Sequence, residues 1–100
     1  MKYQIVFTSE FEADIEAKII WLQDQHVSQN TIDDWFGRLY ERLWGVAEMP
    51  RLYPVDEQYT ADVGRVSRKL IFREHLAVYQ VDEEQRRIEF VAFHHAAARS

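Results

Sequence analysis

The chain has 100 residues, of which 47% are hydrophobic and 29% charged, with no cysteine and a formal net charge of −5. This balance excludes a disordered chain and is typical of one folded unit, so we expect a single domain over residues 1–100. The lack of cysteine excludes disulfides, thiolate metal sites and cysteine nucleophiles, and the acidic charge makes general nucleic-acid binding unfavourable, so such contacts must be local.

The first predicted elements are a strand and a helix. Residues 2–8 alternate in polarity, which predicts a strand. Ser9 then begins a helix; its hydroxyl can cap the first turn, with Glu12 as the capping-box partner three residues later. One apolar stripe recurs every three or four residues, at Phe11, Ile15, Ile19 and Leu22. We expect this helix to end within residues 24–26.

A second helix is predicted after a short polar loop over residues 26–30. Its apolar stripe consists of Ile32, Phe36, Leu39, Leu43 and Val46. The dipeptide Met49-Pro50 ends it, because proline cannot continue the hydrogen-bond ladder. Two amphipathic helices joined by a short loop form an antiparallel hairpin. Residues 51–64 show little periodicity, which indicates a loop and a natural place for functional surface.

Three strands are predicted after this loop, over residues 65–72, 76–81 and 87–94. The segments between them are short enough for hairpin turns, so the three strands should be antiparallel neighbours. The predicted order is β-α-α-β-β-β. This is an α+β fold in which the helix hairpin packs on one face of a mainly antiparallel sheet.

The sequence shows no segment for export or for crossing a membrane. Residues 2–7 alternate, and the longest apolar runs, such as residues 19–22 and 90–93, have four residues. A spanning helix needs about 20 apolar residues. We therefore expect a cytoplasmic protein without a membrane partner.

Four segments, taken in order, carry a resemblance to a known family. They are residues 47–54 at the end of the second helix, residues 68–72 and 76–82 in the central hairpin, and residues 88–99 in the last strand and tail. These segments and the order of elements resemble the RelE/ParE superfamily, the toxins of type II toxin–antitoxin systems. The resemblance implies plasmid stabilisation or growth inhibition, neutralisation by a cognate antitoxin (ParD-like or similar), and no cofactor.

The resemblance implies two alternative activities. RelE-like members cut mRNA in the ribosomal A site, and ParE-like members poison DNA gyrase. We favour the gyrase inhibitor, because the acidic balance suits a protein target and the His-Ala-Ala-Ala-Arg tail ending at Arg99 is typical of ParE-like members. The alternative is a ribosome-dependent mRNA endonuclease, with the ribosome and mRNA as partners and with Lys69, Arg73 and either His94 or His95 as catalytic residues.

Three cations are predicted on one face of the second strand. Arg65, Lys69 and Arg73 recur every four residues, about 13 Å apart at about 3.3 Å per residue. Such a row can face phosphates or a partner. It can equally be a solvent-exposed strand face whose charges only keep the protein soluble. Arg68 falls on the opposite face and is expected to be a paired residue near the sheet edge.

His94 and His95 are adjacent, so their side chains must diverge on a strand. By alternation His94 shares a face with Ile88 and Phe90, and His95 shares the other face with Phe93. In RNA cleavage a histidine can protonate the leaving 5′-oxygen, and a buried structural histidine is the alternative for either residue. Adjacent histidines on a strand do not coordinate one ion together, so we expect no metal site.

Three tryptophans, Trp21, Trp35 and Trp44, lie in the helix hairpin beside the apolar stripes. Buried indoles would lock the two helices together, and exposed indoles would mark a partner surface. The resemblance implies such a surface for the antitoxin. Our candidate partner-binding residues are Trp21, Trp35, Arg65, Arg68 and Arg99.

Overall fold

The structure is a computed structural model that describes residues 3–99, without the side chain of Arg99. The elements are β1 (Gln4–Phe7), α1 (Ser9–Asp24), α2 (Gln29–Gly45), α3 (Glu57–Val63), β2 (Arg68–Phe72), β3 (His75–Asp82), β4 (Arg87–His95) and a 3-10 helix, η1 (Ala96–Arg99). The predicted α+β class and the order of the two long helices and four strands are confirmed.

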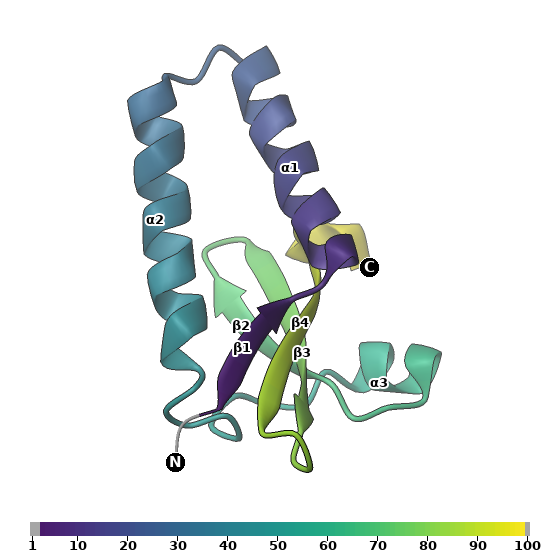
Figure 1. The fold of residues 1–100 in the computed structure, drawn as a ribbon. Helices are drawn as coiled ribbons and strands as arrows, with labels where there is room; N and C mark the ends of the chain where they lie inside the picture. Colours follow the sequence, from purple (N-terminus) through teal and green to yellow (C-terminus); the bar gives the residue numbers. More distant parts are fainter. Residues whose placement is uncertain (1–2, 100) are drawn as a thin grey trace.

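The sheet is mixed, with the strand order β1-β4-β3-β2. β3 pairs antiparallel with both β2 and β4, whereas β1 runs parallel to β4. The parallel pair follows from the helix hairpin between β1 and the later strands, which returns the chain to the end where it started. α1 and α2 cover one face of the sheet, and α3 lies apart from this hairpin (Figure 1).

The main core lies between the helix hairpin and the sheet face that it covers. It contains both predicted helical stripes together with strand residues such as Leu70, Ala77, Tyr79, Ile88 and Phe90. Phe11 is fully buried at its centre, with ring centroids 5.5 Å from Phe7, 5.5 Å from Phe90 and 6.0 Å from Phe93. This aromatic cluster fixes α1 over β1 and β4, and so positions the far end of α1 beside the sheet.

The first helix is capped by Thr8, so the prediction of Ser9 as the cap is wrong by one residue. Thr8 has extended backbone, and its Oγ1 accepts the N–H of Phe11 at 3.2 Å. The same hydroxyl donates to the carbonyl of Phe90 at 2.8 Å. The Ser9 hydroxyl contacts the exposed Glu10 carboxylate at 3.4 Å. Thr8 therefore joins the helix start to β4.

Thr8→Ala should lower the free energy of unfolding by about 1–2 kcal/mol, because it removes both the cap and the bond to β4. Ser9→Ala is the matched control and should change the stability by less than about 0.5 kcal/mol. Urea unfolding of the two variants measures the difference. Equal losses in both variants would mean that Thr8 is not the working cap.

The third helix, α3, lies inside the segment that we predicted as a loop. Its cap is Asp56, whose carboxylate accepts the N–H of Tyr59 at 3.0 Å, and Gly64 ends it with a φ of 74°. None of its residues is buried, so the helix leaves no apolar stripe in the sequence. The signals that were present are an acidic cap and a glycine stop seven residues after the first helical position.

A β-bulge in β4 changes the predicted faces of the histidines. Tyr79 pairs with Phe90 but Val78 pairs with Ala92, so Val91 is an extra residue. Beyond the bulge, Phe93 joins Ile88 and Phe90 in the core. The prediction that His94 shares a face with Ile88 and Phe90 is therefore wrong.

Candidate functional site

The predicted row of three cations does not form, because β2 starts later than predicted. Arg65 precedes the strand, Lys69 lies within it, and Arg73 follows it in a turn with a φ of 55°. Leu70 faces the helices as part of the core, so its neighbour Lys69 points to the opposite face of the sheet. The three side chains therefore occupy different environments.

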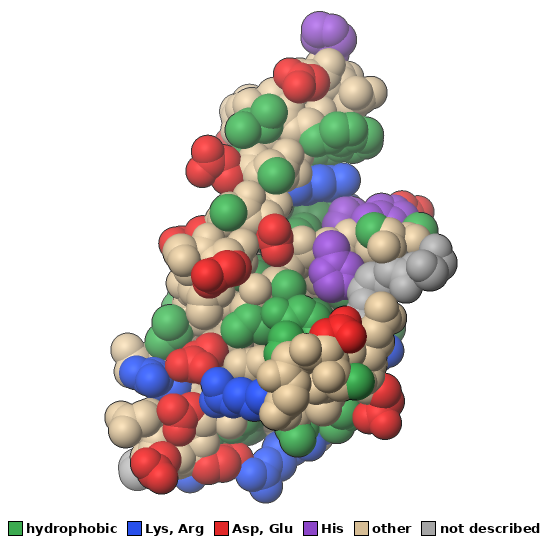
Figure 2. Space-filling model, turned by 90° about the vertical axis from the view of Figure 1, so that its right-hand side faces the viewer, with side chains coloured by type: hydrophobic (Ala, Val, Ile, Leu, Met, Phe, Trp, Pro, Cys, Tyr) green, Lys and Arg blue, Asp and Glu red, His purple; other side chains and the backbone are tan. Residues whose placement is uncertain are grey.

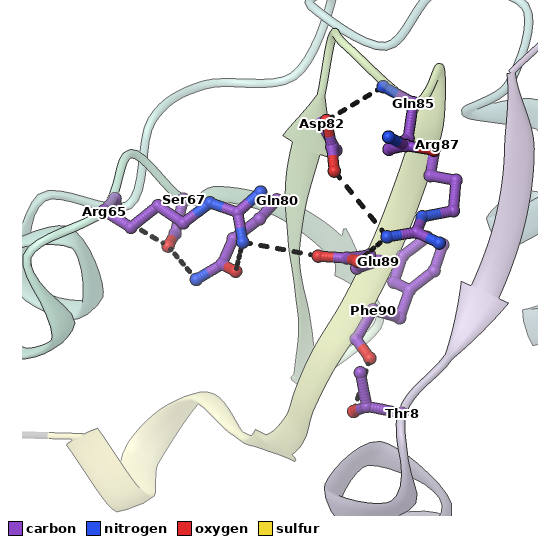
Figure 3. Close-up of polar contacts among 9 residues, drawn as sticks. All are labelled: Thr8, Arg65, Ser67, Gln80, Asp82, Gln85, Arg87, Glu89 and Phe90. Atoms are coloured by element: carbon purple, nitrogen blue, oxygen red, sulfur yellow. Dashed lines mark hydrogen bonds and ion pairs between the residues drawn. The ribbon is translucent and has the colours of Figure 1, made fainter.

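Arg65 is held in a polar network on the sheet (Figure 3). Its guanidinium donates to Gln80 Oε1 at 3.0 Å and pairs with Glu89 at 3.3 Å. Glu89 also pairs with Arg87 at 3.3 Å, and Arg87 with Asp82 at 3.7 Å. Two carboxylates thus balance two guanidinium groups, which leaves little net positive charge here.

Arg68 anchors the loop that follows α2. Its guanidinium donates to the carbonyl oxygen of Tyr53 at 2.7 Å. The fully buried Tyr79 donates its hydroxyl proton to the carbonyl of Pro50 at 2.6 Å, from the strand paired with β2. Arg68 and Tyr79 therefore fix the loop from two neighbouring strands, and Arg68 has a structural partner.

A groove lies between α1 and the end of the sheet where the β2–β3 turn and the end of β4 meet. One part encloses about 410 Å³, and a neighbouring part continues along α1 past Asp14 and Ala17 toward His94. Its main side chains come from five segments of the chain: Lys18, Trp21, Trp35, Arg73, His75 and His95. Figure 2 shows histidine side chains gathered on this side of the molecule, next to hydrophobic and cationic groups.

His75 forms the buried part of the groove, with 6% of its surface exposed. Its ring stacks on Phe93 at 5.1 Å and meets the edge of Trp35 at 5.2 Å. Its Nδ1 atom is buried and has no hydrogen-bond partner among the residues that the structure describes. Burial first, and then the charge of Lys18, lower the pKa of His75 to about 4. The imidazole is therefore neutral near pH 7.

His95 is oriented by two hydrogen bonds. Its Nδ1 accepts the backbone N–H of Ala97 at 3.1 Å, and its Nε2 lies 3.2 Å from Glu74 Oε2. Because Nδ1 is an acceptor, the neutral ring carries its proton on Nε2 and donates it to Glu74. The backbone N–H of Ala96 also donates to the carbonyl of Glu74 at 2.8 Å. These bonds hold η1 against the β2–β3 turn.

The two cations of the groove lie over aromatic rings. The Lys18 ammonium is 4.4 Å from the ring centroid of Trp21, and the Arg73 guanidinium is 5.1 Å from that of Phe72. Neither cation forms an ion pair with a carboxylate within the described residues 3–99. Trp21 is 53% exposed, so its indole is open to a ligand.

The groove gathers part of the predicted site and adds two residues that sequence reasoning missed. The candidates that it brings together are Trp21, Trp35, Arg73, His94 and His95. Arg65, Arg68 and Lys69 lie elsewhere, and the side chain of Arg99 is outside the described residues. Lys18 carried no sequence signal. His75 was assigned to a turn, although it directly precedes an apolar strand and so could have been placed in it.

Across residues 3–99 no three His, Asp or Glu side chains are grouped so that they could hold a metal ion. No helix in the same range is long and apolar enough to cross a membrane.

A helix hairpin over one face of a mixed four-stranded sheet makes this an α+β protein. Neither a family model nor a curated protein matches the chain. A solved structure of a mutant E. coli toxin RelE in the free state is similar, with a TM-score of 0.58 and 17% identity over 98% of this chain and 87% of that one. At this identity the similarity shows the fold alone. The chain therefore has the RelE/ParE toxin fold, as the resemblance in the sequence implied.

Proposed function

We propose that this chain is the toxin of a type II toxin–antitoxin pair and that it inhibits DNA gyrase. The fold supports the first part, and the separation of Lys69 from Arg73 and His95 supports the second, because the predicted catalytic set does not come together. Lys69 points away from the helices, Arg73 and His95 line the groove on the helix side, and Arg65 is paired with Glu89. Cations close to the reacting phosphate stabilise the transition state of RNA cleavage, whereas inhibition of a protein target needs no such cluster.

The exposed surface of the hairpin supports an antitoxin partner. Trp21 is half exposed in the groove, and large exposed aromatic side chains are typical of partner surfaces. The exposed surface of α1 also carries the carboxylates of Glu10, Glu12 and Glu16. An antitoxin segment that lies along this surface should therefore be basic or apolar.

The target is tested by inducing the chain in cells without its antitoxin and following DNA, RNA and protein synthesis separately. We expect DNA synthesis to stop first, with filamentation, because poisoned gyrase breaks DNA. Purified protein should also trap cleaved plasmid in the presence of gyrase. Intact plasmid at saturating protein, together with an early loss of protein synthesis, would contradict the gyrase assignment.

A second candidate function is RNA cleavage in the groove, and one observation favours it. His95 is held by Glu74 beside Arg73 and Lys18, so a proton donor and two cations share one cavity. If His95 gives up the hydrogen bond from Ala97 and takes up a proton on Nδ1, it could donate to a leaving 5′-oxygen while the cations stabilise the charged phosphorane. Lys69, which was predicted to take part, lies on the other sheet face.

For the RNA-cleaving alternative, we expect His95→Ala to lower the cleavage rate at least about 100-fold, which is the usual contribution of a general acid. His26→Ala is the matched control, because His26 is exposed in the α1–α2 loop. Primer extension on mRNA after induction measures cleavage. Equal cleavage by wild type and His95→Ala would end this alternative, and thermal melts show whether both variants fold.

A further inference from the structure

We propose that the groove beside α1 is a binding site for a small aromatic anion, meaning a flat ring that carries one phosphate or carboxylate group. This proposal does not depend on the target of the toxin. It rests on the flat side chains and the two cations that the groove brings together.

The aromatic part of the ligand has flat surfaces to stack on. Trp21 presents an indole that is 53% exposed, and His75 and Trp35 line the same cavity. His95 is held in a fixed orientation by Ala97 and Glu74. Rigid rings lose little freedom when they bind, so a planar ligand should stack here at low entropic cost.

The groove offers an anion two cationic hydrogen-bond donors, although its two carboxylates offset their charge overall. Its two carboxylates already have partners: Asp14 Oδ2 accepts the backbone N–H of Phe93 at 3.0 Å, and Glu74 accepts from His95. The two cations, Lys18 and Arg73, lack a carboxylate partner in the part of the chain that is described. An anionic group between them would gain two charge-assisted hydrogen bonds.

A buried histidine lines the groove beside the exposed indole of Trp21. His75 is 94% buried because 6% is exposed, and its Nδ1 has no partner among residues 3–99. Because this atom is buried, a ligand in the groove can contact it only if the ring of His75 turns. The cavity of about 410 Å³ lies in the range of small-molecule sites.

Two sources of ligand share this chemistry, namely nucleoside monophosphates and aromatic carboxylates. The first experiment titrates ¹⁵N-labelled protein with AMP, UMP and indole-3-acetate and follows the three indole N–H signals. Inorganic phosphate and adenosine are the matched probes for the anion and the ring alone. We expect saturable shifts of Trp21 and Trp35 with at least one aromatic anion, while Trp44, which lies outside the groove, stays fixed.

Variants then assign the contacts. Trp21→Leu should weaken the binding about tenfold through lost stacking, and Lys18→Gln with Arg73→Gln should do the same through lost charge. Trp44→Leu is the matched control, because Trp44 is 54% exposed and Trp21 is 53% exposed. Binding that is unchanged in the groove variants would overturn the proposal, as would equal binding of adenosine and AMP.

The outcomes separate this proposal from the proposed function. Saturation by a nucleotide supports a nucleotide site, and saturation by indole-3-acetate alone supports a carboxylate site. An ordinary small-ligand site saturates below about 10 mM ligand. The absence of a saturable shift up to that concentration would overturn the proposal. The gyrase and synthesis assays use no added ligand, so the binding proposal and the proposed function can each be contradicted without the other.

Discussion

Replacing His75 with phenylalanine should remove a loss of stability that the wild-type protein shows between about pH 6.5 and about pH 4. The ring of His75 stacks on Phe93 and meets Trp35, and phenylalanine can keep both contacts. What phenylalanine lacks is the titrating nitrogen. The expected difference between the two proteins is therefore a difference in pH dependence.

The sign follows from the two pKa values. In the unfolded chain His75 has its ordinary pKa of 6.5, and in the folded protein burial, followed by Lys18, lowers the pKa to about 4. Between these values the unfolded state binds a proton that the folded state does not, so stability falls as the pH falls. Above pH 6.5 the contribution of the neutral His75 ring to the free energy of unfolding is fully present. At pH 4 the free energy of unfolding should be lower by at most about 3 kcal/mol, because one pKa unit corresponds to about 1.36 kcal/mol.

The measurement is urea unfolding at several pH values between 7.5 and 4 for the wild type and the variant, with about 1 kcal/mol as the smallest decisive difference. His26→Phe is the control, because His26 is exposed in the α1–α2 loop and should leave the pH dependence as it is. Carboxylates titrate in both proteins, so they cancel in the comparison. Parallel curves for wild type and His75→Phe would show that His75 does not titrate on unfolding.

Periodicity was enough to predict the parts of the fold that have one apolar face. The stripes of α1 and α2 form the core, and the three later strands lie where their alternation placed them, within a few residues. The same reasoning failed at α3, which buries none of its residues and so has no stripe. It failed again at Val91, because a one-residue bulge in β4 leaves alternation intact on either side.

The candidate site was harder to predict than the fold, because its residues come from distant segments. Trp21 and His95 were singled out by type, and the packing of α1 beside β4 brings them to one groove. Lys18 looked like an ordinary helix-surface lysine. The predicted row through Lys69 assumed an uninterrupted strand from Arg65, and the α3–Gly64 turn delays the strand to Arg68. Side-chain direction along a strand depends on where that strand begins.

Truncating Phe11 to alanine should lower the free energy of unfolding by about 3–5 kcal/mol. Phe11 is fully buried and contacts Phe7, Phe90 and Phe93, so its removal opens a cavity where α1, β1 and β4 meet. A domain of this size has a total stability of about 5–15 kcal/mol, so the loss is a large share. Chemical unfolding at neutral pH measures it. Phe11→Leu keeps most of the volume and should lose clearly less.

The Phe11 variants also separate loss of fold from loss of the groove. Phe11 lies in the core, whereas Trp21 lines the groove two to three turns further along the same helix. If the chain is toxic through its folded surface, Phe11→Ala should be weakly toxic at 37 °C and regain toxicity on cooling to about 20 °C, near the temperature of maximum stability. A change in the groove alone should reduce function equally at both temperatures. Full toxicity of Phe11→Ala at the higher temperature would mean that the aromatic cluster is not what holds α1 on the sheet.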